Sequence, residues 1–407
     1  MLCSEQLHSR RYRLLHIICM KLELTPGPEY FGWMKSTKRP VHLPWGRVVY
    51  ADGGYGLLAR VVERITNQTF EESLVSLLGE PLGLNSTSTT LPPNGSNVFA
   101  LQADGFTTSS WGLDAFLSEG SGGVYSSGSD LRKVGLSILH SELLSPQDTR
   151  EWMNPRGHTS SLTTSLGAPW EIFRLGLPVS PGSNRTRISD LYTKAGGQEG
   201  YGTVIGLSPD HGLGFSLNVA GANAGSERWA LRSAVAETFI PAAEWAAAAN
   251  AADNFAGVYV YPEDETTNIT LSVEADKPGL GLDGFFVDGV DWRNNVSAPF
   301  GLAADLPSAN LSVRLYPNGI AAPNGDVGFY GVPGLVPPTE RSALEGGVGL
   351  FDLGCETWQN LAFYSFAGIW GESFIINVQD GQAVSILSPS SNLTLERRSA
   401  SGGGSPS

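Results

Sequence analysis

Residues 49–58 read Val-Tyr-Ala-Asp-Gly-Gly-Tyr-Gly-Leu-Leu, and a regular apolar pattern begins inside this stretch. Over residues 54–66 the apolar side chains recur three and four positions apart, which is the spacing of one face of a helix. These apolar residues are Leu57, Leu58, Val61, Val62 and Ile65. The pattern predicts an amphipathic helix over 54–66, preceded by Tyr50 and Asp52.

The next segments carry helix-start signals. Thr69 is followed three residues later by Glu72, the spacing of a capping box, so a second helix is expected with Phe70, Leu74 and Leu77 facing inward. Two further helices are predicted, one over 127–140 and a short one after Ser145-Pro146, where proline suits the first helical position.

The pattern then changes to strands. Residues 203–207 and 214–219 are rich in apolar and β-branched residues and are separated by Ser-Pro-Asp-His-Gly, which is typical of a hairpin turn. Residues 226–239 are again helical in pattern, and the alanine-rich run to Asp253 prolongs them. Residues 35–253 are therefore expected to form an α+β domain with an antiparallel sheet flanked by helices.

Helix signals are absent from the sequence after Phe255. Short strands recur between Gly, Pro and Asn turns, for example at 257–261, 269–273, 311–315 and 374–378. This pattern predicts an all-β domain over 254–397, either a sandwich or a barrel. Residues 1–34 are an atypical segment, and residues 398–407 form a Ser/Gly-rich tail that we expect to be disordered.

Composition excludes several classes of function. The chain of 407 residues has a formal net charge of −14, so general binding to nucleic acid is not expected. No run of about 18 apolar residues occurs, so no membrane-spanning helix is expected. No motif for a metal or a cofactor is present, and Cys3, Cys19 and Cys355 match no zinc site. We therefore expect neither a metal nor a cofactor.

Asparagine sequons point to the secretory pathway. Eight N-x-Ser/Thr motifs occur, more than chance predicts for this composition, and such motifs mark surface loops of secreted proteins. Their asparagines are Asn67, Asn85, Asn94, Asn184, Asn268, Asn295, Asn310 and Asn392. Residues 14–20 make only a weak signal peptide, so we expect a secreted glycoprotein whose true N-terminus is missing from this chain.

Three stretches taken in order resemble one family. The Tyr50-x-Asp52-x-Gly54-Tyr55 segment, residues 122–131 and Lys194-Ala195-Gly196-Gly197 with the hairpin to Asp210 are similar to motifs of β-lactamase-related serine hydrolases. These are the class C β-lactamases, DD-peptidases and esterases. The resemblance covers about residues 35–250 and implies a β-lactamase/transpeptidase-like fold. Residues 255–397 look like the β domain appended to some fungal, secreted members.

The resemblance implies roles for particular residues. Tyr50 would be the base that takes a proton from a serine nucleophile, and Lys194 the cation that lowers its pKa or binds a substrate carboxylate. The amide of Gly197 would hold the oxyanion, and the small residues Ala195 and Gly196 would let the substrate backbone approach.

Two positions depart from the family pattern. Asp52 replaces the usual asparagine, which would raise the pKa of Tyr50 and pair with any nearby lysine. Ala195 replaces a threonine and removes a hydroxyl.

The family nucleophile is absent from this sequence. It lies in an S-x-x-K motif, but none of the six lysines has a serine three residues before it. We therefore expect an N-terminally truncated chain that is inactive by itself. The apolar faces of the 54–66 and 226–240 helices should then be partly uncovered.

Three functions remain open at this point. The full-length protein would be a serine hydrolase or acyltransferase that acts on a small ester, amide or lactam by Ser/Lys/Tyr acyl-enzyme chemistry. The first alternative is a non-catalytic secreted binding protein derived from that fold, which Asp52 and the missing serine favour. The second is a tailoring acyl hydrolase or transferase of a natural-product pathway.

Overall fold

The computed structural model describes residues 32, 35–36, 39, 43, 46–93, 109–112, 119–275, 277–297, 311–335, 361–362, 365–366 and 368–398. The expectations for residues 1–31, for the three cysteines, for Asn94 and Asn310 and for the tail lie outside these residues. The chain divides into two units, Met1–Leu175 with Ser189–Glu237 and Gly176–Ile188 with Thr238–Ser407. The domain boundaries expected from the sequence stay predictions.

Three helices of the first part of the chain begin at residues whose side chains cap them. Thr69 and Glu72 form the full capping box, and the side chains of Ser127 and Ser145 accept hydrogen bonds from the amides of Asp130 and Asp148. The helices are α3 (Asp52–Thr66), α4 (Phe70–Leu74), the π-helix η1 (Val75–Gly79), α5 (Glu80–Leu82), α6 (Glu119–Gly122), α7 (Gly128–Leu139) and α8 (Pro146–Met153).

The π-helical turn η1 corrects one expectation. Leu77, expected to face inward, is 55% exposed, while Ser73 is buried. A wider turn changes the direction in which the following side chains point, so the face predicted from a continuous α-helix does not hold there. The segment ends at Gly83, whose φ of 61° is the left-handed conformation that glycine adopts without strain.

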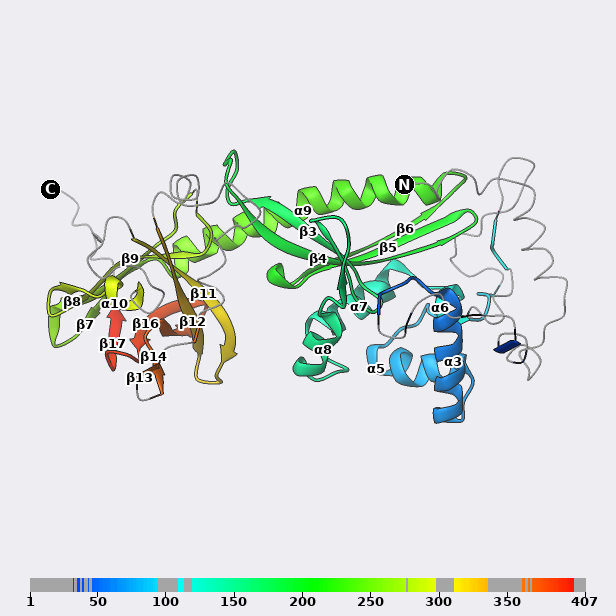
Figure 1. Ribbon diagram of the computed structural model, residues 1–407, viewed down its shortest axis with the longest axis horizontal. Helices are drawn as coiled ribbons and strands as arrows, with labels where there is room; N and C mark the ends of the chain where they lie inside the picture. Colours follow the sequence, from blue (N-terminus) through cyan, green and yellow to red (C-terminus); the bar gives the residue numbers. More distant parts are fainter. Residues whose placement is uncertain are drawn as a thin grey trace, which may run out of the picture. The chain divides into compact units, whose positions relative to one another are not determined.

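The first sheet is antiparallel and open, and its six strands follow chain order. They are β1 (Gly157–His158), β2 (Thr164–Leu166), β3 (Glu171–Pro178), β4 (Thr186–Gln198), β5 (Tyr201–Ser208) and β6 (Leu213–Ala220), with the 3-10 turn η3 (Pro209–His211) between the last two. Helix α9 (Ala224–Asn254) runs along one face, and α7 and α8 lie on the other (Figure 1). Buried Met153, Trp170, Ile172 and Leu207 form the core cluster of this part.

The apolar stripe on α3 is largely uncovered, as expected. Leu58 and Val61 are exposed and Ile65 is 79% exposed, whereas the helix buries Gly56 and Ala59. On α9, Leu231 and Phe239 are exposed as well. The two helices therefore present apolar surface that the described residues do not cover.

The second unit contains a closed antiparallel barrel. Its strand order is β9-β11-β12-β15-β16-β17-β7-β8, and a β8–β9 pairing closes the ring. The all-β domain is thus a barrel, the second of the two expected forms. Its elements are β7 (Gly257–Tyr261), β8 (Asp264–Ser272), β9 (Leu280–Val287), β10 (Val290–Asp291), α10 (Arg293–Ser297), β11 (Leu311–Ala321), β12 (Asp326–Leu335), β13 (Ser365–Phe366), β14 (Ile369–Trp370), β15 (Ser373–Gln379), β16 (Gln382–Ser388) and β17 (Leu393–Arg397).

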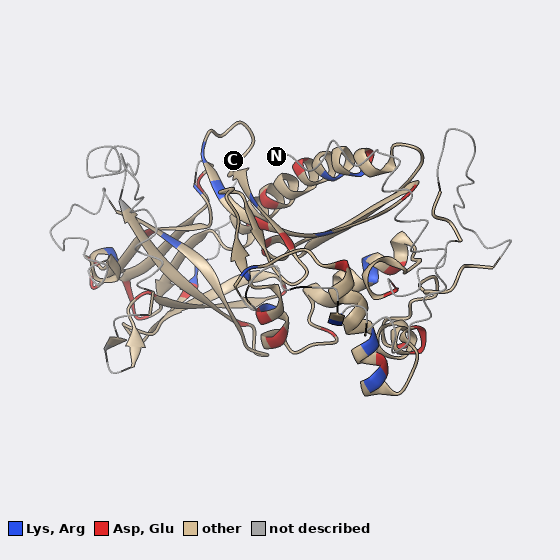
Figure 2. Ribbon diagram, turned by 45° about the vertical axis from the view of Figure 1, so that its right-hand side comes forward, with Lys and Arg blue, Asp and Glu red and all other residues tan. Residues whose placement is uncertain are grey.

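The barrel interior is filled by side chains. Phe285 and Phe374 meet edge to face with ring centroids 5.9 Å apart, and Tyr259, Ile376 and Ile386 are fully buried beside them. Alternation along each strand directs these side chains inward, and eight strands leave an interior that side chains can fill. Charged residues are sparse on most strands, which is consistent with a charged fraction of 16% (Figure 2).

Candidate active site

The structure brings Tyr50 and Lys194 together although they are far apart in the sequence. Tyr50 lies just before α3 and is 71% exposed, while Lys194 lies on β4. The Nζ atom of Lys194 is 5.2 Å from the centroid of the Tyr50 ring. At this distance the ammonium group interacts favourably with the face of the ring.

Lys194 has an acidic partner that differs from the expected one. Its Nζ donates to Glu171 Oε1 at 3.0 Å and to the carbonyl of Ala195 at 2.7 Å. Asp52, which we expected to pair with a nearby lysine, makes no ion pair with Lys194 in the described part of the chain. The reason lies in the fold: Glu171 begins β3, beside Lys194, while Asp52 stands in the first turn of α3, where the helix N-terminus favours a carboxylate.

Tyr55 is a third member of this cluster that we did not predict as a site residue. Partial burial raises the pKa of Tyr55, the charge of Lys194 lowers it and Tyr50 raises it. The tyrosine therefore lies within electrostatic range of both predicted residues. The signal for it was present, because Tyr55 ends the Tyr50-x-Asp52-x-Gly54-Tyr55 segment.

The glycines of the β4–β5 hairpin differ in what lies next to them. A Cβ at Gly197 would collide with the guanidinium of Arg228, which donates to the carbonyl of Gly196. A Cβ at Gly202, directly opposite Gly197, would collide with the Ala224 carbonyl. The space beside Gly197 and Gly202 therefore admits α9. The expected roles of the Gly197 amide with the oxyanion and of Ala195 and Gly196 beside the substrate stay predictions.

The segment before α7 is fixed against α3. Arg60 pairs with Glu63 on its own helix and with Glu119 on α6, at 2.8 and 2.7 Å. A Cβ at Gly120 would lie 2.8 Å from the Tyr55 carbonyl oxygen, so only glycine allows the two helices to approach this closely. These contacts hold the start of α3, which follows Tyr50, against residues 119–122.

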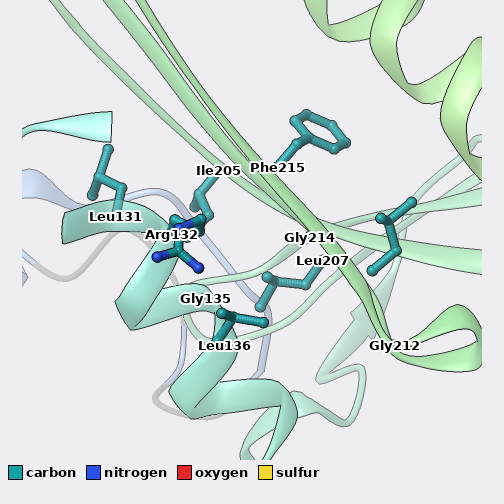
Figure 3. Close-up of a pocket in the computed structure, with 10 residues that line it drawn as sticks. Leu131, Arg132, Gly135, Leu136, Ile205, Leu207, Gly212, Gly214 and Phe215 are labelled. Carbon is teal, nitrogen blue, oxygen red and sulfur yellow. The ribbon is translucent and has the colours of Figure 1, made fainter. Parts of the chain in front are cut away.

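A small apolar pocket lies on the same face of the sheet as Lys194. Its volume is about 200 Å³, and it is bounded by α7, β5 and the start of β6 (Figure 3). Ile205, one of its lining residues, is directly opposite Lys194 in the β4–β5 ladder. Leu131, Leu136 and Leu207 make the remaining wall largely aliphatic, and Arg132 is its charged residue.

The described sequon asparagines lie at the surface. Asn67, Asn85, Asn184, Asn295 and Asn392 are exposed, and Asn268 is half-buried. Their positions are compatible with glycosylation, which stays a prediction together with secretion. None of the helices in the described residues is long and apolar enough to cross a bilayer.

Two family models match the chain. The model described as "Beta-lactamase" matches residues 29–238, and that described as "Beta-lactamase-like-like, C-terminal domain" matches residues 247–399.

Several individual proteins are also similar to this chain. A "Beta-lactamase-like protein" of Arthroderma benhamiae is 28% identical over 91% of this chain and 64% of its own length. A "Probable hydrolase M10" of Phoma sp. is 30% identical over 60% of this chain and 39% of its own length. The chain thus spans less than two thirds of each relative. Among solved structures, a beta-lactamase/D-alanine carboxypeptidase of Pseudomonas syringae is 20% identical over 53% of this chain and 66% of its own, with a TM-score of 0.41.

Proposed function

The chain belongs to the beta-lactamase family of hydrolases, and from this premise we propose that the whole protein cleaves or transfers the acyl group of a small ester, amide or lactam. One observation carries the proposal: the Lys194 ammonium lies 5.2 Å from the centroid of the Tyr50 ring. A base and a cation placed together are what acyl transfer to a serine requires. The proposal assigns no residue of this chain to the nucleophile.

Each residue has a stated task in this proposal. Tyr50 takes the proton of the attacking hydroxyl and returns it to the leaving group. Lys194 stabilises the tyrosinate that forms and attracts an anionic group of the substrate. Glu171 holds the Lys194 side chain in place through the 3.0 Å ion pair, and it also reduces the net positive charge that Tyr50 experiences. Arg228 fixes the backbone at Gly196 from behind.

The Glu171–Lys194 pair favours a second candidate, a binding protein without catalysis. A neutralised lysine activates a tyrosine less than a free one does, while it still donates a hydrogen bond to a ligand. In both candidates the same residues bind the ligand, so the two differ in whether an acyl group becomes attached to the whole protein.

Binding of a fluorescent penicillin, followed by intact mass measurement, tests the proposal. We expect saturable non-covalent binding to the 407-residue chain and no added mass, because no nucleophile is assigned. Lys194→Met should weaken binding about tenfold or more, since a charge-assisted hydrogen bond contributes about 1.5–3 kcal/mol.

Lys277→Met is the matched control, because Lys277 lies in the barrel unit and pairs with Glu274. It should leave binding unchanged. An acyl adduct on this chain would show that it holds a nucleophile and would contradict the assignment above. Equal binding by the Lys194→Met variant would remove Lys194 from the site.

A further inference from the structure

Trp111 stands between two tyrosines at the turn end of the β4–β5 hairpin. Its ring centroid is 5.2 Å from that of Tyr125, edge to face, and 6.1 Å from that of Tyr201, at an interplanar angle of 37°. Both separations are within the range in which aromatic pairs attract one another. The three rings come from three segments, the stretch 109–112, the stretch before α7, and β5.

Backbone contacts hold this aromatic group in place. The Ser110 amide donates to the Glu199 carbonyl at 2.8 Å, and the Gly112 amide donates to Tyr125 Oη at 3.3 Å. The Gln198 side chain donates to the Gly122 carbonyl at 3.4 Å. The position of Trp111 is thus tied to the hairpin that also carries Lys194.

The register of the hairpin places the aromatic group and Lys194 on one face. Lys194 is opposite Ile205, Gly196 is opposite Thr203, and Gln198 is opposite Tyr201. Residues directly opposite one another, and every second residue along a strand, project to the same side. Lys194 and Tyr201 are therefore on the same side, separated by four residues of strand or about 13 Å.

Between them, Gly196 leaves space on this side, and the Gln198 side chain lies on the same side at the end of the strand, next to Gly122. Gly196 has no side chain, and the space next to it is limited by the Thr203 hydroxyl, which would be 2.6 Å from an added Cβ. A ligand lying along β4 on this side would meet an ammonium group, a glycine with a neighbouring hydroxyl, the Gln198 amide, and then the rings of Tyr201 and Trp111.

We propose that Trp111, supported by Tyr125 and Tyr201, binds an aromatic group of the substrate while Lys194 binds an anionic or strongly polarised group about 13 Å away. The inference rests on the proposed function and gives its substrate class: esters, amides or lactams with an aromatic acyl or leaving group. Flat apolar rings are favoured because stacking on a tryptophan adds attraction beyond that of burial alone.

Two ligands that share one anionic core test the inference. Benzylpenicillin carries an aromatic acyl group, and 6-aminopenicillanic acid lacks it. By isothermal titration we expect the chain to bind benzylpenicillin about tenfold more tightly. Trp111→Leu should reduce benzylpenicillin binding about tenfold and leave 6-aminopenicillanic acid unchanged, and Trp111→Phe should restore most of the difference.

Further variants separate failure of this inference from failure of the proposed function. Lys194→Met should weaken both ligands, and Trp370→Leu, a change at an exposed tryptophan of the barrel unit, should weaken neither. If neither ligand binds, or if Lys194→Met changes nothing, the proposed function fails. If both ligands bind through Lys194 but Trp111→Leu weakens neither of them or weakens both equally, the aromatic subsite is wrong. The Trp111→Phe variant keeps an aromatic side chain at this position and shows whether an equal weakening came from loss of folding.

Discussion

The open sheet of the first unit has edge strands, whereas the barrel of the second unit is closed. In the barrel, the β8–β9 pairing closes the ring, and the inward side chains form one large buried cluster. In the open sheet, β1 and β6 each have one strand neighbour among the described residues, and the buried cluster is small. The candidate site lies in the open unit. We therefore expect the barrel to be the more stable unit and the candidate site to lie in the less stable one.

The largest effect should come from two matched isoleucine substitutions. Ile376 in the barrel is 0% exposed, whereas Ile65 on α3 is 79% exposed. Ile376→Ala should lower the free energy of unfolding of the barrel by about 2–5 kcal/mol, because it leaves a cavity in a closed core. Ile65→Ala should change stability by less than about 0.5 kcal/mol.

Urea unfolding followed by circular dichroism measures both isoleucine changes. If Ile65→Ala lowered the free energy of unfolding as much as Ile376→Ala does, the apolar stripe of α3 would be covered in solution. The contrast between the two units would then disappear.

The stability of the barrel should depend on pH because of one buried tyrosine. Burial raises the pKa of Tyr259 to about 12, while Arg397 acts to lower it. Because an unfolded tyrosine titrates near pH 10, the barrel should keep its full stability below pH 10 and lose about 2–3 kcal/mol as the pH rises to about 12.

Tyr259→Phe is the control for this titration. It removes the 2.7 Å hydrogen bond to the Phe255 carbonyl and should cost about 1 kcal/mol at neutral pH. It should also reduce the loss between pH 10 and pH 12, as measured by urea unfolding at each pH. An unchanged pH dependence in this variant would assign the alkaline loss to another group.

The smallest effect concerns the packing of α9 on the open sheet. Gly202→Ala places a methyl group against the Ala224 carbonyl and 3.0 Å from Arg228 Cδ, so it should cost about 1–2 kcal/mol by overpacking. Gly225 lies on α9 and has open space around it, so Gly225→Ala should leave the stability unchanged or raise it slightly. Thermal unfolding of both variants measures this, and equal midpoints would contradict the close approach of α9.

Local signals in the sequence were sufficient for the capped helices of the first unit and for the β5–β6 hairpin. The Thr69–Glu72 capping box and the Ser127 cap depend on residues a few positions apart, so their spacing alone predicts them. The juxtaposition of Tyr50 and Lys194 followed from motif resemblance. The barrel could be predicted only as one of two forms, because its closure depends on the register of β8 against β9.

The remaining site residues depend on contacts that spacing does not encode. Glu171 reaches Lys194 because β3 lies beside β4, and no strand was predicted over 171–178. Arg228 contacts Gly196 through the packing of a helix on a sheet. Trp111 meets Tyr201 although the two are far apart in the sequence and no element was predicted around Trp111. Each of these contacts joins segments that are distant in the sequence, and no local pattern predicts which distant segments meet.

The long hairpin of β3 and β4 has a consequence for how the two family modules were joined. The matches divide the chain between residues 238 and 247, yet Gly176–Ile188 belongs to the unit that follows. Arg187 on that hairpin pairs with Glu244 at 2.6 Å, and Trp245 donates to the Pro178 carbonyl. Cutting the chain before Glu244 would leave the hairpin tip without these partners. The second unit therefore includes a segment from inside the first family match, so a single cut in the chain cannot separate the two units.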